Sequence, residues 1–142
     1  MIFEVQTLDL IDLLSERHVR IRNLCNQLWN KNHNLYISNS EWLIIAIAYK
    51  NQPTIAYVTK KMDISRQATH KFIKNMEING LVEINNVQDN NKYKCARLTK
   101  LGETCFEENE IIKATVEKKI IETIGAEKAA LLKDLLKLDW GL

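Results

Sequence analysis

Five polar or basic side chains in the segment 64–81, ISRQATHKFIKNMEINGL, fall on one face of a predicted helix. On a wheel with about 100° per residue, they lie almost opposite a stripe that has the i, i+3, i+4, i+7 spacing of a buried face. The polar set consists of Arg66, Gln67, His70, Lys71 and Lys74, and the buried stripe of Thr69, Phe72, Ile73 and Met76. The chemistry that the polar face offers is hydrogen bonding and charge pairing with base edges and phosphates.

The order of these donors along the helix suggests which part of DNA they contact, and His70 is interpreted as a DNA contact as well. The first residues of the second helix in a helix-turn-helix reach base edges in the DNA major groove. Arg66 can form two hydrogen bonds to guanine, and Gln67 can form two to adenine. Lys71 and Lys74 lie further along, where phosphate contact is expected, and Ser65 can bond a phosphate through its hydroxyl or amide. The alternative is an ordinary solvated helix face.

The neighbouring residues predict a winged helix-turn-helix. A short helix over 54–62 comes first, Ser65 suits the N-cap of the second helix, and Gly80 stands at that helix's end. A hairpin follows, with strands GLVEINNV (80–87) and KYKCARLT (92–99) and the turn QDNN (88–91). Three basic residues lie on or near the turn, where a wing would meet the minor groove: Lys92, Lys94 and Arg97.

Helices are also predicted on both sides of this unit. Residues 8–30 have helical apolar spacing, and Ser38 and Glu41 have the spacing of a capping box that opens a helix ending before Pro53. After the hairpin, a long helix reaches Gly125 and a leucine-rich helix follows it. The end helices carry more apolar residues than so small a unit could cover, so we expect them to pair with a second copy of the chain.

The predicted fold class is therefore mainly α with a small β-hairpin wing. We expect one domain over 1–142, with an N-terminal dimer helix (8–30), a winged helix-turn-helix (38–100) and C-terminal dimer helices (101–142).

Composition agrees with a protein that contacts phosphate. The 142 residues carry a net charge of +2, but residues 54–100 hold nine Lys/Arg against four Asp/Glu, a local +5. No apolar run approaches the roughly 18 residues of a membrane span, and the N-terminus has no signal-peptide pattern. Three cysteines without metal-ligand spacing favour reduced thiols and a cytoplasmic location.

Three segments resemble the MarR family of bacterial transcription regulators. ISNSEWLIIAIA (37–48) resembles the family's helix that leads into the DNA-binding unit, and 58–83 resembles its helix-turn-helix. ARLTKLGE (96–103) resembles the family's L-T-x-x-G, which closes the wing and opens the long dimer helix. The resemblance implies a homodimer on a pseudo-palindromic operator with half-sites about one helical turn apart. It also implies a repressor that a small aromatic or anionic effector releases from DNA.

The wing departs from the family pattern, which has Asp-x-Arg at the wing tip. Here Asn90 and Lys92 stand in those places, and Asp89 is one residue early. Lys is a compact, strongly hydrated charge that suits a narrow minor groove less well than Arg. We therefore expect a weaker or differently shaped wing contact.

Family geometry suggests an effector site, although its aromatic residues are more often core residues. Tyr36 and Trp42 could line it, and Arg17 or Arg20 could pair with an anion.

Other functions have less support in the sequence. A winged-helix module that binds only protein is one alternative, and thiol-based redox sensing through Cys25, Cys95 or Cys105 is another, although Cys25 is expected in the core. The scattered histidines, His18, His33 and His70, do not suggest a metal site. No cofactor motif or enzyme motif is found.

Overall fold

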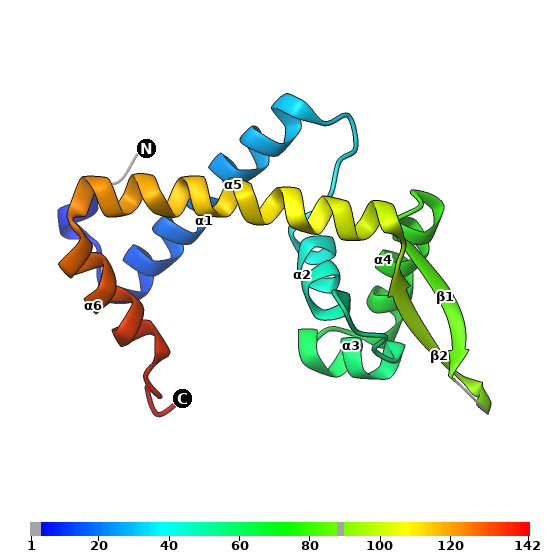
Figure 1. Cartoon of the computed structure of the whole chain (residues 1–142). Helices are drawn as coiled ribbons and strands as arrows, with labels where there is room; N and C mark the ends of the chain where they lie inside the picture. The colour runs from blue at the N-terminus through cyan, green and yellow to red at the C-terminus, as the bar shows by residue number, and fades with distance from the viewer. Residues whose placement is uncertain (1–3, 88–89) are drawn as a thin grey trace. The chain divides into compact units, whose positions relative to one another are not determined.

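The computed structural model describes residues 4–87 and 90–142 (Figure 1). A 3-10 turn, Val5–Thr7, comes first. The other elements are α1 (Leu10–Asn32), α2 (Asn39–Ala48), α3 (Ile55–Met62), α4 (Arg66–Ile78), β1 (Val82–Val87), β2 (Asn90–Leu98), α5 (Lys100–Ile124) and α6 (Ala126–Lys137). The predicted class, mainly α with one antiparallel hairpin, is confirmed. None of the helices in these described ranges is long and apolar enough to cross a membrane.

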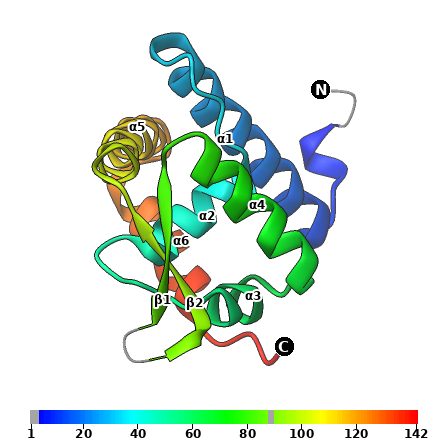
Figure 2. The same ribbon diagram turned by 90° about the vertical axis from the view of Figure 1, so that its right-hand side faces the viewer.

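The chain divides into two compact units. The helical unit comprises Met1–Asn32 and Glu110–Leu142, and the winged unit comprises His33–Asn109. In the winged unit, α2, α3 and α4 pack against one another and against the hairpin (Figure 2). The organisation as one domain over 1–142 remains a prediction.

Side-chain N-caps begin α2, α3 and α4, and those of α2 and α4 were predicted from the sequence. At α2 the predicted capping box is confirmed: the Ser38 hydroxyl accepts from the Glu41 amide at 3.2 Å, and the Glu41 carboxylate accepts from the Ser38 amide at 3.0 Å. Thr54 caps α3 at 3.0 Å. Ser65 caps α4 by accepting from the Ala68 amide, also at 3.0 Å.

Backbone in the left-handed region ends two of these helices. Asp63 (φ +53°) forms the turn between α3 and α4. Gly80 (φ +75°) follows α4, where the Leu81 amide donates to the Met76 carbonyl at 2.9 Å. This glycine-based helix end was expected from the sequence.

The hairpin strands are shifted relative to the prediction: β1 begins at Val82 rather than Gly80, and β2 runs from Asn90 to Leu98 rather than from Lys92 to Thr99. Asn90 and Asn91, assigned to the turn from sequence, belong to β2, and Val87 pairs with Asn90 across an irregularity in the ladder. The turn prediction was wrong at these two residues because β2 begins at Asn90, and local composition does not report strand pairing. At the other end, Ala96 donates its amide to the Pro53 carbonyl at 2.9 Å, which joins the segment before α3 to β2.

The winged unit has the larger buried core. Its buried apolar residues are Ile37, Trp42, Ile44, Ile45, Ala48, Ile55, Val58, Ile73, Met76, Leu81, Val82, Cys95, Ala96, Leu98 and Cys105. In the helical unit, Cys25, Trp29 and Val116 are buried, whereas α6 exposes large apolar side chains. Those on α6 and just after it are Leu131, Leu132, Leu135, Leu136 and Leu138, each 46–62% exposed.

Candidate nucleic-acid interface

Helix α4 separates its residues into the two faces expected from sequence. Thr69, Ile73 and Met76 are buried, although Phe72 is only half-buried. The residues assigned to DNA contact are all exposed: Ser65, Arg66, Gln67, His70, Lys71 and Lys74. We call the exposed set 66, 67, 70, 71 and 74 the polar face of α4.

Most of the polar face has no side-chain partner within the described part of the chain. Arg66, Gln67, His70 and Lys71 form no side-chain hydrogen bond or ion pair there, so their donors are available to an external ligand. Lys74 pairs with Glu77 at 3.2 Å. Because that pair is on the surface, it contributes little free energy and its ammonium can exchange onto a phosphate.

Hydroxyl contacts hold α4 against α3. The Thr59 and Thr69 hydroxyls lie 2.8 Å apart, and Thr69 donates to the Ser65 carbonyl at 3.0 Å. Thr69 is fully buried, so this network replaces the water that the hydroxyl loses on folding. The helix-turn-helix pair is therefore fixed by polar contacts as well as by apolar packing.

Two basic residues of the wing, Lys94 and Arg97, already have hydrogen-bond partners within the hairpin. Arg97 pairs with Glu83 across the strands at 2.5 Å, which raises the pKa of Arg97, and Lys94 bonds to Asn86. The DNA contacts assigned to Lys94 and Arg97 remain predictions and would require these partners to be exchanged. Asp89 and the side chains of Asn90 and Lys92 lie outside the described residues, so the altered wing tip remains a sequence observation.

The L-T-x-x-G segment joins the end of α4 to the start of α5. Thr99 donates its hydroxyl to the Gly80 carbonyl at 2.6 Å and accepts from the Gly102 amide at 3.1 Å, so it caps α5 while contacting the end of α4. The Thr99 amide donates to the Leu81 carbonyl at 3.0 Å. Gly102 is buried at this junction, and a Cβ there would lie 2.2 Å from the Leu81 carbonyl oxygen. The sequence pattern indicated the L-T-x-x-G motif, but it could not predict the close approach of Gly102 to Leu81.

The four residues suggested for an effector site are divided between the units. In the helical unit, Arg17 and Arg20 are exposed and contact the Glu16 carboxylate at 3.1 and 2.8 Å. In the winged unit, Tyr36 is exposed and Trp42 is buried. Their role in effector binding remains a prediction.

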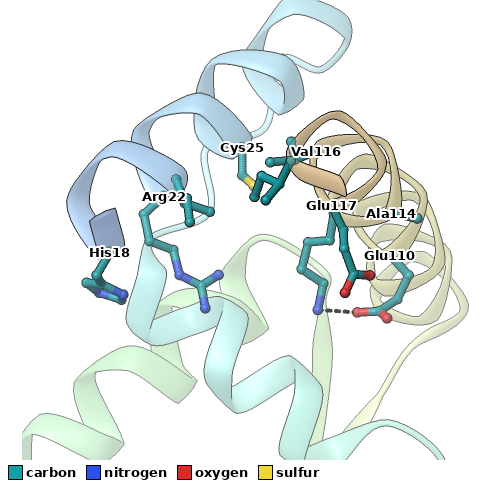
Figure 3. Close-up of a pocket in the computed structure, with 10 residues that line it drawn as sticks. His18, Arg22, Cys25, Glu110, Ala114, Val116 and Glu117 are labelled. Carbon is teal, nitrogen blue, oxygen red and sulfur yellow. Dashed lines mark ion pairs between the residues drawn. The ribbon is translucent and has the colours of Figure 1, made fainter. Parts of the chain in front are cut away.

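The helical unit contains a hollow that sequence reasoning missed. It has a volume of about 530 Å³ and lies between α1 and α5 (Figure 3). Ile21, Cys25 and Val116 contribute apolar lining, and His18 and Arg22 stand beside them. Lys113, which lines the hollow from α5, forms an ion pair with Glu110. Residues 18, 22 and 25 are spaced i, i+4, i+7, so the sequence did place them on one helix face, but it could not show what that face borders.

The cysteines have the environment of core residues. Cys25, Cys95 and Cys105 are buried free thiols. Burial raises the pKa of Cys25, against the opposing effect of Arg22 and Lys113, and burial together with the Glu108 charge raises the pKa of Cys105. Raised thiol pKa values disfavour the reactive thiolate.

The three histidines lie on different structural elements. His18 borders the hollow, His70 lies on α4, and His33 pairs with Glu108 at 2.5 Å. Among the described residues, no group of three or more His, Cys, Asp or Glu side chains could hold a metal ion.

Comparison with solved structures identifies the architecture. A mutant of MarR from E. coli superposes with a TM-score of 0.73 at 17% sequence identity, covering 92% of this chain and 95% of that one. A MarR family protein from Bacillus stearothermophilus gives 0.74 at 20% identity, covering 90% and 88%. The chain has the fold of the MarR regulators.

A third similar structure is MepR, a transcription regulator of the Staphylococcus aureus multidrug efflux pump MepA. Its TM-score is 0.73 at 15% identity, covering 91% of this chain and 94% of that one. Comparison of the sequence with protein-family models and with curated proteins finds no significant match. The likeness to MarR regulators is therefore carried by the fold.

Proposed function

We propose that this protein is a homodimeric, sequence-specific DNA-binding transcription regulator that represses its target and is released by a small effector. The observation that carries the proposal is the polar face of α4. In a winged helix-turn-helix, this face belongs to the helix that enters the major groove. Its two leading donors, Arg66 and Gln67, are exposed and unpaired within the described structure.

The exposed leucines of α6 support the dimer. Leu131, Leu132, Leu135 and Leu136 span a wide arc of the helix, each about half exposed. Lys133, about 60° around the α6 axis from Leu136, pairs with Glu117 of α5 at 2.8 Å. Lys133 is thus engaged within the chain, and the leucine face is free to bury against a second copy. Two copies would present two α4 helices to a pseudo-palindromic site.

The hollow between α1 and α5 supports release by an effector. Lys113 is paired with Glu110, and Glu117, which also lines the hollow, is paired with Lys133, so Arg22 and His18 remain beside an apolar surface. An organic anion with an aromatic or aliphatic body would match both features. Arg22 therefore joins Arg17 and Arg20 as a candidate partner for the anionic effector suggested by the sequence.

Substitutions on α4 test the DNA-binding assignment. Arg66→Ala removes a base-edge contact and should cost about 1–3 kcal/mol on the preferred duplex while relaxing base preference at one position. Lys71→Ala removes a phosphate contact, so it should weaken binding to all duplexes and reduce the slope of log K against log salt by about one. Lys119→Ala, an exposed lysine on α5, is the matched control. Unchanged binding in both α4 variants would contradict the assignment and favour a protein-binding winged helix.

A further inference from the structure

Glu41 is the one buried charged side chain in the described part of the chain, with 4% of its surface exposed. Its two carboxylate oxygens serve different helices. Oε1 accepts from the Ser38 amide at 3.0 Å and completes the α2 capping box. Oε2 accepts from Nδ2 of Asn75 on α4, also at 3.0 Å. Burying a carboxylate is costly unless its oxygens are hydrogen-bonded, and both oxygens are satisfied here.

The second hydrogen bond is not needed for the cap. A capping box uses one side-chain oxygen at this position, and Oε1 supplies it. Oε2 instead bonds to a residue 34 positions away in the sequence, on the helix that carries the polar face. The contact therefore concerns the placement of α4 relative to α2.

Asn75 lies at the edge of the polar face. At about 100° per residue, it is about 40° beyond Lys71 and about 60° short of Phe72 around the α4 axis. Apolar packing through Ile73 and Met76 holds α4 onto the core but depends weakly on direction, and the Thr59–Thr69 hydrogen bond orients α4 only against α3. A hydrogen bond to a carboxylate is short and directional, so it can fix the rotation of α4 about its own axis.

We propose that Glu41 is a positioning residue for DNA recognition, which holds α4 through Asn75 so that Arg66 and Gln67 present their donors at one fixed angle. This role rests on the proposed DNA-binding function. Phosphate contacts tolerate small rotations because they depend on charge, whereas base-edge contacts need exact geometry. Losing the Glu41–Asn75 bond therefore lowers discrimination between sequences more than it lowers general affinity.

The test measures discrimination directly. The probes are a duplex that the wild-type protein enriches from a randomised pool and a scrambled duplex of the same composition. Asn75→Ala should lower the ratio of the two affinities about tenfold, which is comparable to the loss of one base contact, while the salt dependence stays unchanged. Asn30→Ala, an exposed asparagine on α1, is the matched control and should keep the wild-type ratio.

A conservative variant separates positioning from the charge of Glu41. In Glu41→Gln, the new amide can accept from the Ser38 amide and donate to Asn75 once the Asn75 amide turns over. This variant should retain the wild-type ratio, whereas Glu41→Ala should lose it. Thermal unfolding followed by circular dichroism gives the temperature range in which all variants are folded. The DNA affinities are then measured at one temperature within that range.

Different results would overturn the positioning role of Glu41 and the proposed DNA-binding function. If the wild type discriminates between the duplexes and folded Asn75→Ala discriminates equally well, the positioning role is overturned and DNA recognition stands. If the wild type enriches no sequence from the pool, the proposed function is overturned, and the positioning role is overturned with it.

Discussion

Replacing Gly102 by alanine should destabilise the protein although it improves the local helix propensity. Gly102 lies in the first turn of α5, and its φ is not in the left-handed region, so alanine suits the backbone. In a helix interior, alanine is favoured over glycine by about 1 kcal/mol. The new Cβ, however, would lie 2.2 Å from the Leu81 carbonyl oxygen and 3.2 Å from a methyl carbon of Leu98.

The carbonyl cannot move away without further cost. It accepts the Thr99 amide at 3.0 Å, so a shift of about an ångström would break a hydrogen bond worth about 1 kcal/mol. Overpacking a rigid site costs about 1–3 kcal/mol, and contact with a backbone atom belongs at the upper end of that range. After the gain in helix propensity is subtracted, we expect a net loss of about 2–3 kcal/mol in the free energy of unfolding.

Urea denaturation followed by circular dichroism measures this loss. Thr104→Ala is the control, because Thr104 is exposed on the same helix and its replacement should change stability by less than about 0.5 kcal/mol. A Gly102→Ala protein that is as stable as the wild type, or more stable, would refute the view that glycine is required for close approach to Leu81.

Two further predictions concern titratable groups. Lys133 lowers the pKa of Glu117 through a hydrogen bond and through its charge. The ion pair therefore stabilises the attachment of α6 to α5 at pH values above 4.5, the ordinary pKa of glutamate. This stabilisation is lost as the pH falls through the lowered pKa of Glu117. Lys133→Ala should raise the Glu117 pKa towards 4.5, as measured by carboxyl carbon NMR shifts, and an unmoved titration would show that the pair does not form. Burial raises the pKa of Cys25 and Cys105, so both should resist iodoacetamide in the folded protein near neutral pH and react after denaturation. Rapid labelling of Cys25 or Cys105 in the folded protein, detected by mass spectrometry, would contradict this prediction and support the redox-sensing alternative.

Local sequence patterns predicted the elements and faces of the winged unit. Ser38 with Glu41, and Ser65 alone, marked helix starts because a cap is a contact between residues three apart. The apolar spacing of α4 separated its buried and exposed faces for the same reason: the helix period alone fixes which residues share a side.

Contacts between residues far apart in the chain could not be predicted from local sequence patterns. The bond from Asn75 to Glu41, the pairing of Arg97 with Glu83, and the approach of Gly102 to Leu81 each depend on how separate elements pack. For the same reason, sequence patterns could not show that Arg22 borders a hollow.

The central claim is that this winged unit recognises a DNA sequence. The most direct measurement titrates the purified protein against a fluorescent duplex from upstream of its own gene, with a scrambled duplex as control, and follows anisotropy at two salt concentrations. We predict preferential binding at two chains per duplex, with affinity that falls steeply as salt rises because bound phosphates release counterions. Absence of binding to either duplex, even at low salt, would contradict the claim and point to a winged helix that binds protein.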